Sequence, residues 1–294
     1  MRLLLVLFLL SCGPVAVPAA QADDQEAVQA RQKINLSGRQ RMLTQRMTAA
    51  ACLVMINVDR ENRILVAQGA HGDFERALHG LVHGDPELNL LPTQSATVRA
   101  ALAEVDVVWR ELGPAVLQLS AGDLHTVVIG QILAENLPAL RLSNAAVGEF
   151  VKLYGSSDLD PALARAIDVA GRQRMLSQKM MKEACFVSAG LSPQENAAQL
   201  RETIQLFDAS LQDLRQGDTD AGIAPPPTDA VAEQLETVAK AWVQYKSALN
   251  AVEPVVAIGD PRDQLAALAQ QSDAILSAAH QAVLLYVAGA AGAD

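Results

Sequence analysis

Two stretches of this sequence decide the fold: residues 34–47, INLSGRQRMLTQRM, and residues 167–180, IDVAGRQRMLSQKM. The second repeats the first at an offset of 133 residues, and nine of the fourteen aligned positions are identical. The same offset aligns further pairs, namely Cys52 with Cys185, Phe74 with Phe207, Leu78 with Leu211, Leu81 with Leu214, Gly84-Asp85 with Gly217-Asp218 and Trp109 with Trp242. Because this register holds over about 75 residues, we infer that one domain is written twice.

Within each copy, apolar residues recur at intervals of three and four, which is the periodicity of amphipathic helices. Glycine and proline separate the periodic stretches, and Thr93 and Thr228, each after a proline, are candidate helix N-caps. The pattern predicts helices at 24–57, 62–83, 94–120, 123–154, 159–189, 193–216, 228–251 and 261–288. The sequence therefore predicts an all-α fold of two tandem up-and-down four-helix bundles.

The first 22 residues have the features of a secretory signal peptide. Arg2 precedes an apolar run over Leu3–Leu10, and Ala20-Gln21-Ala22 forms an A-x-A cleavage site. The run is too short to span a bilayer, which needs roughly 20 apolar residues. We therefore expect a protein that is exported to the periplasm.

A second interpretation of the N-terminus remains open. Leu9–Cys12 resembles a bacterial lipobox, whose processing would leave a lipidated Cys12 and tether the protein to a membrane. We prefer the A-x-A site, which divides the chain into a signal peptide at 1–22, a first domain at 23–155 and a second domain at 156–294. The junction between the domains is expected at Gly155-Ser156-Ser157.

Composition and spacing argue against several classes of function. A net charge of −10 disfavours nucleic acid, whose phosphates would repel the chain. The sequence contains no CxxC or CxxCH spacing, so we expect neither zinc nor covalent haem, and no other cofactor is indicated. His79 and His83 have the spacing of metal ligands, but Gln212 and Gln216 replace them in the second copy, so we expect no metal site. No catalytic set recurs in both copies, and we do not expect an enzyme.

Two pairs of equivalent residues are assigned to the core. Trp109 and Trp242 should anchor the third helix of each copy. Cys52 and Cys185 could meet as a disulfide if the copies pair, but we expect them to be buried as small apolar side chains instead.

Positive charge gathers around the repeated motif of this acidic chain. Gly38, Arg41 and Gln45 share one helical face, because their steps are three and four residues. A glycine inside a helix costs about 0.5–1 kcal/mol relative to alanine, so its repetition requires close approach of a helix or a ligand. A guanidinium beside exposed backbone suits a small planar oxyanion. The predicted ligand-binding residues are Gly38, Arg41, Gln45, Gly171, Arg174 and Gln178, and the alternative is that these arginines are solvated surface charges.

Both motifs resemble the first-helix motif of the PilJ-type sensor domain, the periplasmic module of type IV pilus methyl-accepting chemotaxis transducers. Nitrate- and nitrite-sensing histidine kinases carry a similar motif. The resemblance implies a four-helix bundle that dimerises, with the first helices of two subunits facing each other to bind one nitrate-like anion. The anion-contacting arginine of that family follows the motif glycine by three residues, which corresponds to Arg41 and Arg174. Asp168 departs from the pattern, since Asn35 is its counterpart and an acid near the site would weaken anion binding.

The sequence favours an exported ligand-binding or sensory-accessory protein whose two bundles pair internally and bind nitrate or nitrite between the repeated first helices. Receptors of the family continue into a membrane helix and a cytoplasmic signalling module, so we expect a membrane receptor or sensor kinase as partner. The alternative function is a helical interaction scaffold for an envelope signalling or pilus system, in which the motif faces only pack.

Overall fold

The structure is a computed structural model that describes residues 19–155, 159–252 and 261–289. Over these ranges the chain forms eight α-helices, which are α1 (Ala19–Met55), α2 (Arg60–His83), α3 (Ala96–Ser120), α4 (Thr126–Tyr154), α5 (Pro161–Ser188), α6 (Pro193–Gln216), α7 (Asp229–Val252) and α8 (Pro261–Gly289). A 3-10 helix, η1 (Pro86–Leu88), lies between α2 and α3, and the same ranges contain no β-strand. The all-α prediction is confirmed.

Most of the expected signal peptide, including Cys12, lies outside the described residues. So do Ser156 and Ser157 of the expected domain junction, whereas Gly155 directly follows α4. None of the helices in the described ranges combines the length and the apolar character that crossing a membrane requires.

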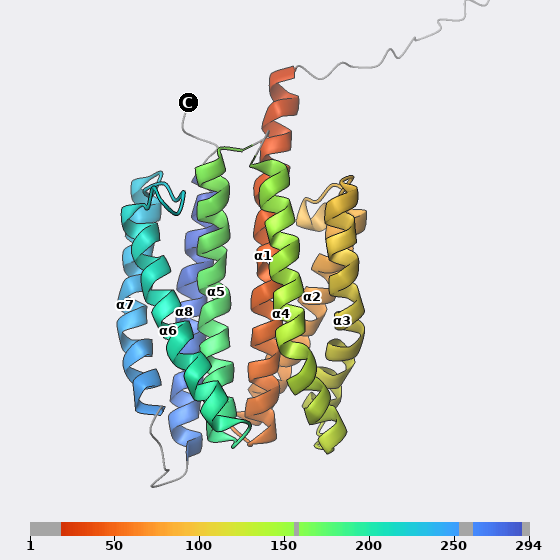
Figure 1. The fold of residues 1–294 in the computed structure, drawn as a ribbon, viewed down its shortest axis with the longest axis vertical. Helices are drawn as coiled ribbons and strands as arrows, with labels where there is room; N and C mark the ends of the chain where they lie inside the picture. Colours follow the sequence, from red (N-terminus) through yellow and green to blue (C-terminus); the bar gives the residue numbers. More distant parts are fainter. Residues whose placement is uncertain (1–18, 156–158, 253–260, 290–294) are drawn as a thin grey trace, which may run out of the picture.

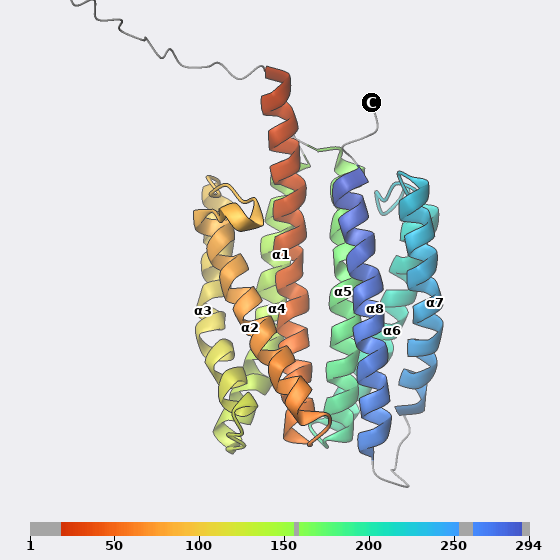
Figure 2. The ribbon, with the colours of Figure 1, turned by 180° about the vertical axis from the view of Figure 1, so that it is seen from behind.

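The eight helices form two four-helix bundles that stand side by side (Figures 1 and 2). Helices α1–α4 make the first bundle and α5–α8 the second, and α1 packs along α5 at the centre of the molecule. Both central helices run in the same direction, so the copies are related by an approximate two-fold axis parallel to them. This arrangement is the internal pairing of repeated first helices that the sequence predicts.

Equivalent aromatic pairs anchor the third helix of each bundle. The Trp109 ring stacks on Phe74 with centroids 4.2 Å apart, and Trp242 lies at the same 4.2 Å from Phe207. Both tryptophans are buried, which confirms their assignment to the core. Rings of this size contribute much of the apolar area that holds α3 and α7 in place.

The two predicted N-caps have different outcomes. Thr228 is confirmed, since its Oγ1 accepts a hydrogen bond from the amide of Val231 at 3.3 Å. Thr93 is wrong, because the cap of α3 is Ser95, whose Oγ accepts from the amide of Val98 at 3.4 Å. The chain stays non-helical for two residues longer than predicted, and the Thr93 side chain is buried instead.

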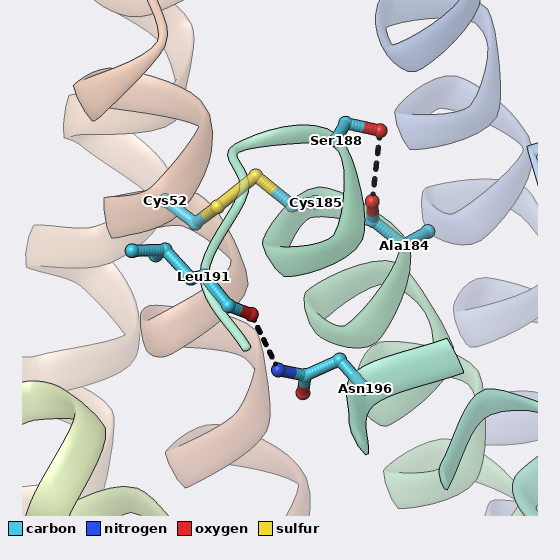
Figure 3. The surroundings of a disulfide bond; sticks show 6 residues. All are labelled: Cys52, Ala184, Cys185, Ser188, Leu191 and Asn196. Atoms are coloured by element: carbon cyan, nitrogen blue, oxygen red, sulfur yellow. Dashed lines mark hydrogen bonds between the residues drawn. A yellow bond between two sulfur atoms is a disulfide. The ribbon is translucent and has the colours of Figure 1, made fainter. Parts of the chain in front are cut away.

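A disulfide joins the two copies near the C-terminal ends of α1 and α5 (Figure 3). Cys52 and Cys185 are bonded at 2.08 Å with their Cα atoms 6.2 Å apart, a separation that disulfides normally show. The expectation of unbonded thiols is therefore wrong, although both residues are buried as predicted. Equivalent residues on the facing sides of two parallel helices meet at the approximate two-fold axis, and this geometry brings the two sulfur atoms together.

Candidate functional site

The candidate site lies in the middle of the contact between α1 and α5. Helix α1 is almost continuously buried from residue 29 to residue 54, because α2, α4 and α5 surround it. Polar side chains of the motif are therefore enclosed, and each needs a partner inside the protein. Most of the polar residues of the motif are therefore buried at the centre of the molecule and are not exposed to solvent.

Arg41 and Arg174 are among the most deeply buried side chains of the described residues, with 1% and 0% of their surface exposed. The interpretation of these arginines as solvated surface charges is therefore wrong. A methyl group built on Gly38 would lie 3.3 Å from Nη2 of Arg41 and 3.8 Å from Nη2 of Arg174. On Gly171 the corresponding distances are 3.5 Å and 3.3 Å. The two glycines thus leave room for both guanidinium groups, which come together between the helices.

Each arginine of the pair reaches across to the other central helix. Nη2 of Arg41 donates to the main-chain oxygen of Asp168 at 3.2 Å, and Nη2 of Arg174 donates to that of Asn35 at 3.2 Å. Asn35 and Asp168 are equivalent positions of the two copies. The backbone half of the site is therefore symmetric.

The side-chain half of the site is not symmetric. Nη1 of Arg41 donates to Asn144 of α4 at 3.0 Å and lies 2.7 Å from the Asp168 carboxylate, as an ion pair. Nη1 of Arg174 instead contacts Nδ1 of His280 of α8 at 3.2 Å. Among the described residues no acidic side chain forms an ion pair with Arg174. Within the described ranges, one guanidinium therefore has a carboxylate counterion and the other has none.

The carboxylate of Asp168 forms ion pairs with several cationic side chains. Besides Arg41, its carboxylate contacts Arg165 at 3.4 Å and Arg172 at 3.1 Å. Burial by itself raises the pKa of Asp168, but the charges of Arg41 and Arg172 outweigh it, and the pKa is lowered. The carboxylate is consequently ionised at neutral pH and remains attached to the Arg41 side of the site.

The Arg174 side of the site is electropositive. Burial, together with the nearby charges of Arg41 and Arg39, lowers the pKa of Arg174 to about 9. Burial and the charges of Arg174 and Arg39 lower the pKa of His280 to about 4. At neutral pH His280 is neutral, so its Nδ1 can accept the hydrogen bond from Arg174. Arg174 remains protonated, and burial is the main reason why its pKa is lowered.

The two predicted glutamines are buried near the pair but bond elsewhere. Gln178 donates from Nε2 to Oγ of Ser272 in α8 at 2.9 Å, and its Oε1 accepts from Arg46 at 3.3 Å. Gln45 donates to Thr44 at 3.2 Å, and its buried Oε1 has no hydrogen-bond partner. Gly38, Arg41, Gly171 and Arg174 thus come together, whereas the glutamines extend the polar layer along the helices.

Sequence reasoning missed Asn144 and His280. Both lie on the fourth helix of a bundle, outside the repeated motif, and at the offset of 133 residues His280 aligns with Val147. No repeated signal therefore marks them. The rings of His79 and His83 lie 4.6 Å apart, and the described part of the chain contains no group of three His, Cys, Asp or Glu that could hold a metal ion.

The bundles coincide with a known domain. The family model described as the N-terminal part of the type IV pili methyl-accepting chemotaxis transducer, PilJ, matches residues 25–151 and 161–281. The chain belongs to the PilJ family. The two matched segments cover α1–α4 and α5–α8 almost completely, so each bundle is one PilJ sensor domain and the facing arginines come from equivalent places in the two PilJ copies.

A curated relative is similar over part of the chain. The methyl-accepting chemotaxis protein McpN of Pseudomonas aeruginosa is 34% identical over 102 residues. The alignment covers 35% of this chain and 18% of the relative. The chain therefore matches less than one fifth of that receptor, over a length shorter than either PilJ segment.

Proposed function

We propose that the protein is a periplasmic sensory-accessory protein that binds a small oxyanion, such as nitrate or nitrite, between α1 and α5. The observation that carries this proposal is the buried pair of equivalent arginines, Arg41 and Arg174, with Asp168 as counterion on one side alone. Membership of a family of chemotaxis sensor domains supports a sensory role.

The electrostatics of the site explain why an anion would bind there. Two guanidinium groups in a buried site repel each other, because little water remains to screen them. An anion between Arg41 and Arg174 would remove this repulsion and accept charge-assisted hydrogen bonds from both. A ligand that binds only the folded state also stabilises it, by about 2.7 kcal/mol at a hundredfold excess over the dissociation constant.

Calorimetric titration of the purified protein with nitrate and nitrite tests the proposal, with melting temperature as a second readout. We expect saturable binding and a rise in melting temperature for the parent, and neither for Arg174→Ala. Arg110→Ala is the matched control. The Arg110 side chain is 74% exposed and forms an ion pair with Asp106 on the same helix, α3. Arg31→Ala is unsuitable as a control, because Arg31 is buried.

The rival function is a helical scaffold for an envelope signalling or pilus system. Its supporting observation is that Arg41 already has a carboxylate partner and that both Nη2 groups already donate to main-chain oxygens. A parent protein that gives a flat trace with nitrate and with nitrite would favour this scaffold over the sensor.

Export and the partner complete the proposal. The apolar N-terminus supports secretion, followed by association with a membrane receptor or sensor kinase that transmits the signal. Mass spectrometry of the native protein should find an N-terminus at Asp23, or a diacylated Cys12 if the lipobox is used. Retention of Met1 would contradict export.

A further inference from the structure

A cavity of about 410 Å³ opens beside the arginine pair, between α1, α2 and α8. Arg174 and His280 form part of its wall. Its apolar wall residues are Met42, Leu43, Leu65, Val66, Ala70 and Leu276. The other half of the lining is polar or charged, so the cavity offers both an apolar surface and groups that can fix a ligand's orientation. Its volume lies in the range of small-molecule sites.

The charged groups at the rim of the cavity are already paired. Arg39 forms an ion pair with Asp73, and Asp273 bridges Arg46 at 2.9 Å and Arg63 at 2.8 Å. These pairs leave Arg174 as the cavity-lining cation for which the described residues supply no carboxylate. Its Nε is buried without a hydrogen-bond partner. A ligand for this cavity therefore needs one negative group.

Two exposed features on α2 show that the cavity is accessible from solvent. A methyl group built on Gly69, which lines the cavity, would meet no atom within 4 Å. Leu65, one turn earlier, has 66% of its surface exposed. The equivalent positions of the second copy hold Glu202 and Ala198, so this surface is specific to the first copy. An exposed leucine beside open space can gain free energy when an apolar group covers it.

We propose that this cavity binds an organic monocarboxylate with an apolar tail. The carboxylate takes the place of His280 as acceptor from Nη1 of Arg174, and the tail lies along α2 against Leu65. The inference rests on the proposed function in one respect, because both assign anion binding to Arg174. The inference adds a second class of ligand, the organic monocarboxylates, and places the apolar part of that ligand along α2.

The size of the cavity separates this ligand from a small inorganic oxyanion. A water molecule takes up about 30 Å³ in the liquid, so an anion of four heavy atoms would leave most of the 410 Å³ to solvent. A chain of four to six carbons would cover the apolar wall as well as the cationic end. Affinity should therefore grow with the length of the tail.

The test is calorimetric titration of the full chain with acetate, butanoate and hexanoate, and with nitrate in parallel. Each methylene that enters the cavity should tighten binding about fourfold, which corresponds to about 0.8 kcal/mol of transfer free energy. Acetate, which has no tail, should bind weakly. A merely electrostatic surface site would bind the three carboxylates equally.

A pair of glycine variants on one helix localises the site. Gly69→Leu places a side chain in the cavity and should abolish the gain from butanoate and hexanoate while leaving nitrate binding unchanged. Gly72→Leu is the matched control, since a methyl group there also meets no atom within 4 Å and Gly72 does not line the cavity. Leu65→Ser, at an exposed position, should reduce the gain from hexanoate without affecting the fold.

The outcomes separate the two ideas. If nitrate binds but the three carboxylates show no dependence on length, the carboxylate site is wrong and the proposed function stands. If the carboxylates bind with the expected dependence and Gly69→Leu removes it, the carboxylate site is supported whether or not nitrate binds. An unchanged dependence in Gly69→Leu places the tail elsewhere and overturns the inference. If neither anion class binds, both proposals fail.

Discussion

Arg41 and Arg174 are equivalent residues with unequal surroundings. Both are buried, both lie over the two motif glycines, and both donate to a main-chain oxygen of the opposite helix. Arg41, however, has the carboxylate of Asp168 at 2.7 Å, whereas Arg174 contacts the neutral ring of His280. The fold thus keeps the backbone of the site symmetric and makes its charge one-sided.

This difference shows what a tandem repeat permits. In a symmetric dimer of identical chains, a residue at one position appears on both sides of the axis. Here the two copies can differ, and the chain has Asn35 on one side and Asp168 on the other. The carboxylate of Asp168 can therefore pair with Arg41, while Arg174 remains available for a ligand.

The largest expected effect comes from removing the covalent link that keeps the unequal copies together. The double variant Cys52→Ala/Cys185→Ala should lower the free energy of unfolding by about 2–5 kcal/mol, because the lost crosslink restricts a long loop of the unfolded chain. Urea unfolding without reductant measures the change, and adding reductant to the parent should reproduce it. Equal stability of parent and variant would show that the helix contacts suffice to pair the copies.

The next effect compares the two arginines directly. Arg41→Ala should destabilise the ligand-free protein by about 3 kcal/mol, since it leaves Asp168 buried with fewer cations. Arg174→Ala should cost less, because it removes an uncompensated charge and relieves the repulsion on Arg41. Urea unfolding of both variants, with Arg110→Ala as an exposed control, measures the difference. Equal losses for the two buried arginines would mean that Asp168 does not distinguish them.

A smaller effect follows from making the two sides alike. Asp168→Asn gives the second copy the residue that Asn35 provides in the first, and it removes a negative charge from the site. We expect nitrate to bind about tenfold more tightly, a change of about 1.4 kcal/mol. Titration calorimetry measures it, and Asp106→Asn, at a partly exposed position of α3, is the control. Unchanged affinity would rule out competition between Asp168 and the ligand.

The smallest effect is a dependence of stability on pH. The pKa of Asp168 in the folded protein lies below its ordinary value of 3.8, so the ionised carboxylate stabilises the fold above that value. As the pH falls below about 4, this contribution is lost progressively. Urea midpoints at pH 5 and pH 3 should therefore fall further for the parent than for Asp168→Asn. A parallel fall in both proteins would assign acid sensitivity to other carboxylates.

Much of the fold follows from local sequence. Helix α6 was predicted at 193–216, where the structure has it, and α1 extends five residues further at its N-terminal end than predicted. The spacing of apolar residues and the glycine and proline residues between helices are local features of the sequence, so they define these boundaries. The cap of α3 at Ser95 instead of Thr93 shows the limit, because both residues are of a capping type and the helical pattern does not fix the first residue to within two positions.

The site was only half predictable. The repeat identified Arg41 and Arg174 and the glycines beneath them, since the same residues recur in both copies. The disulfide and the contact with His280 depend on how the helices pack, and no spacing rule within one helix encodes that. Charge pairing across the axis also required the structure, because it depends on which of two equivalent positions faces which arginine.

The disulfide described above fixes α1 and α5 to each other at one point near their C-terminal ends. At about 1.5 Å of rise per residue, Arg41 lies roughly 16 Å from Cys52 along α1, and Asp23, the expected N-terminus after export, lies roughly 44 Å away. A rotation of α1 about this point that moved the arginines by about 1 Å would move the N-terminal end by about 3 Å. That end of α1 projects beyond the rest of the molecule (Figure 1), so the displacement would be largest where α1 is clear of the other helices.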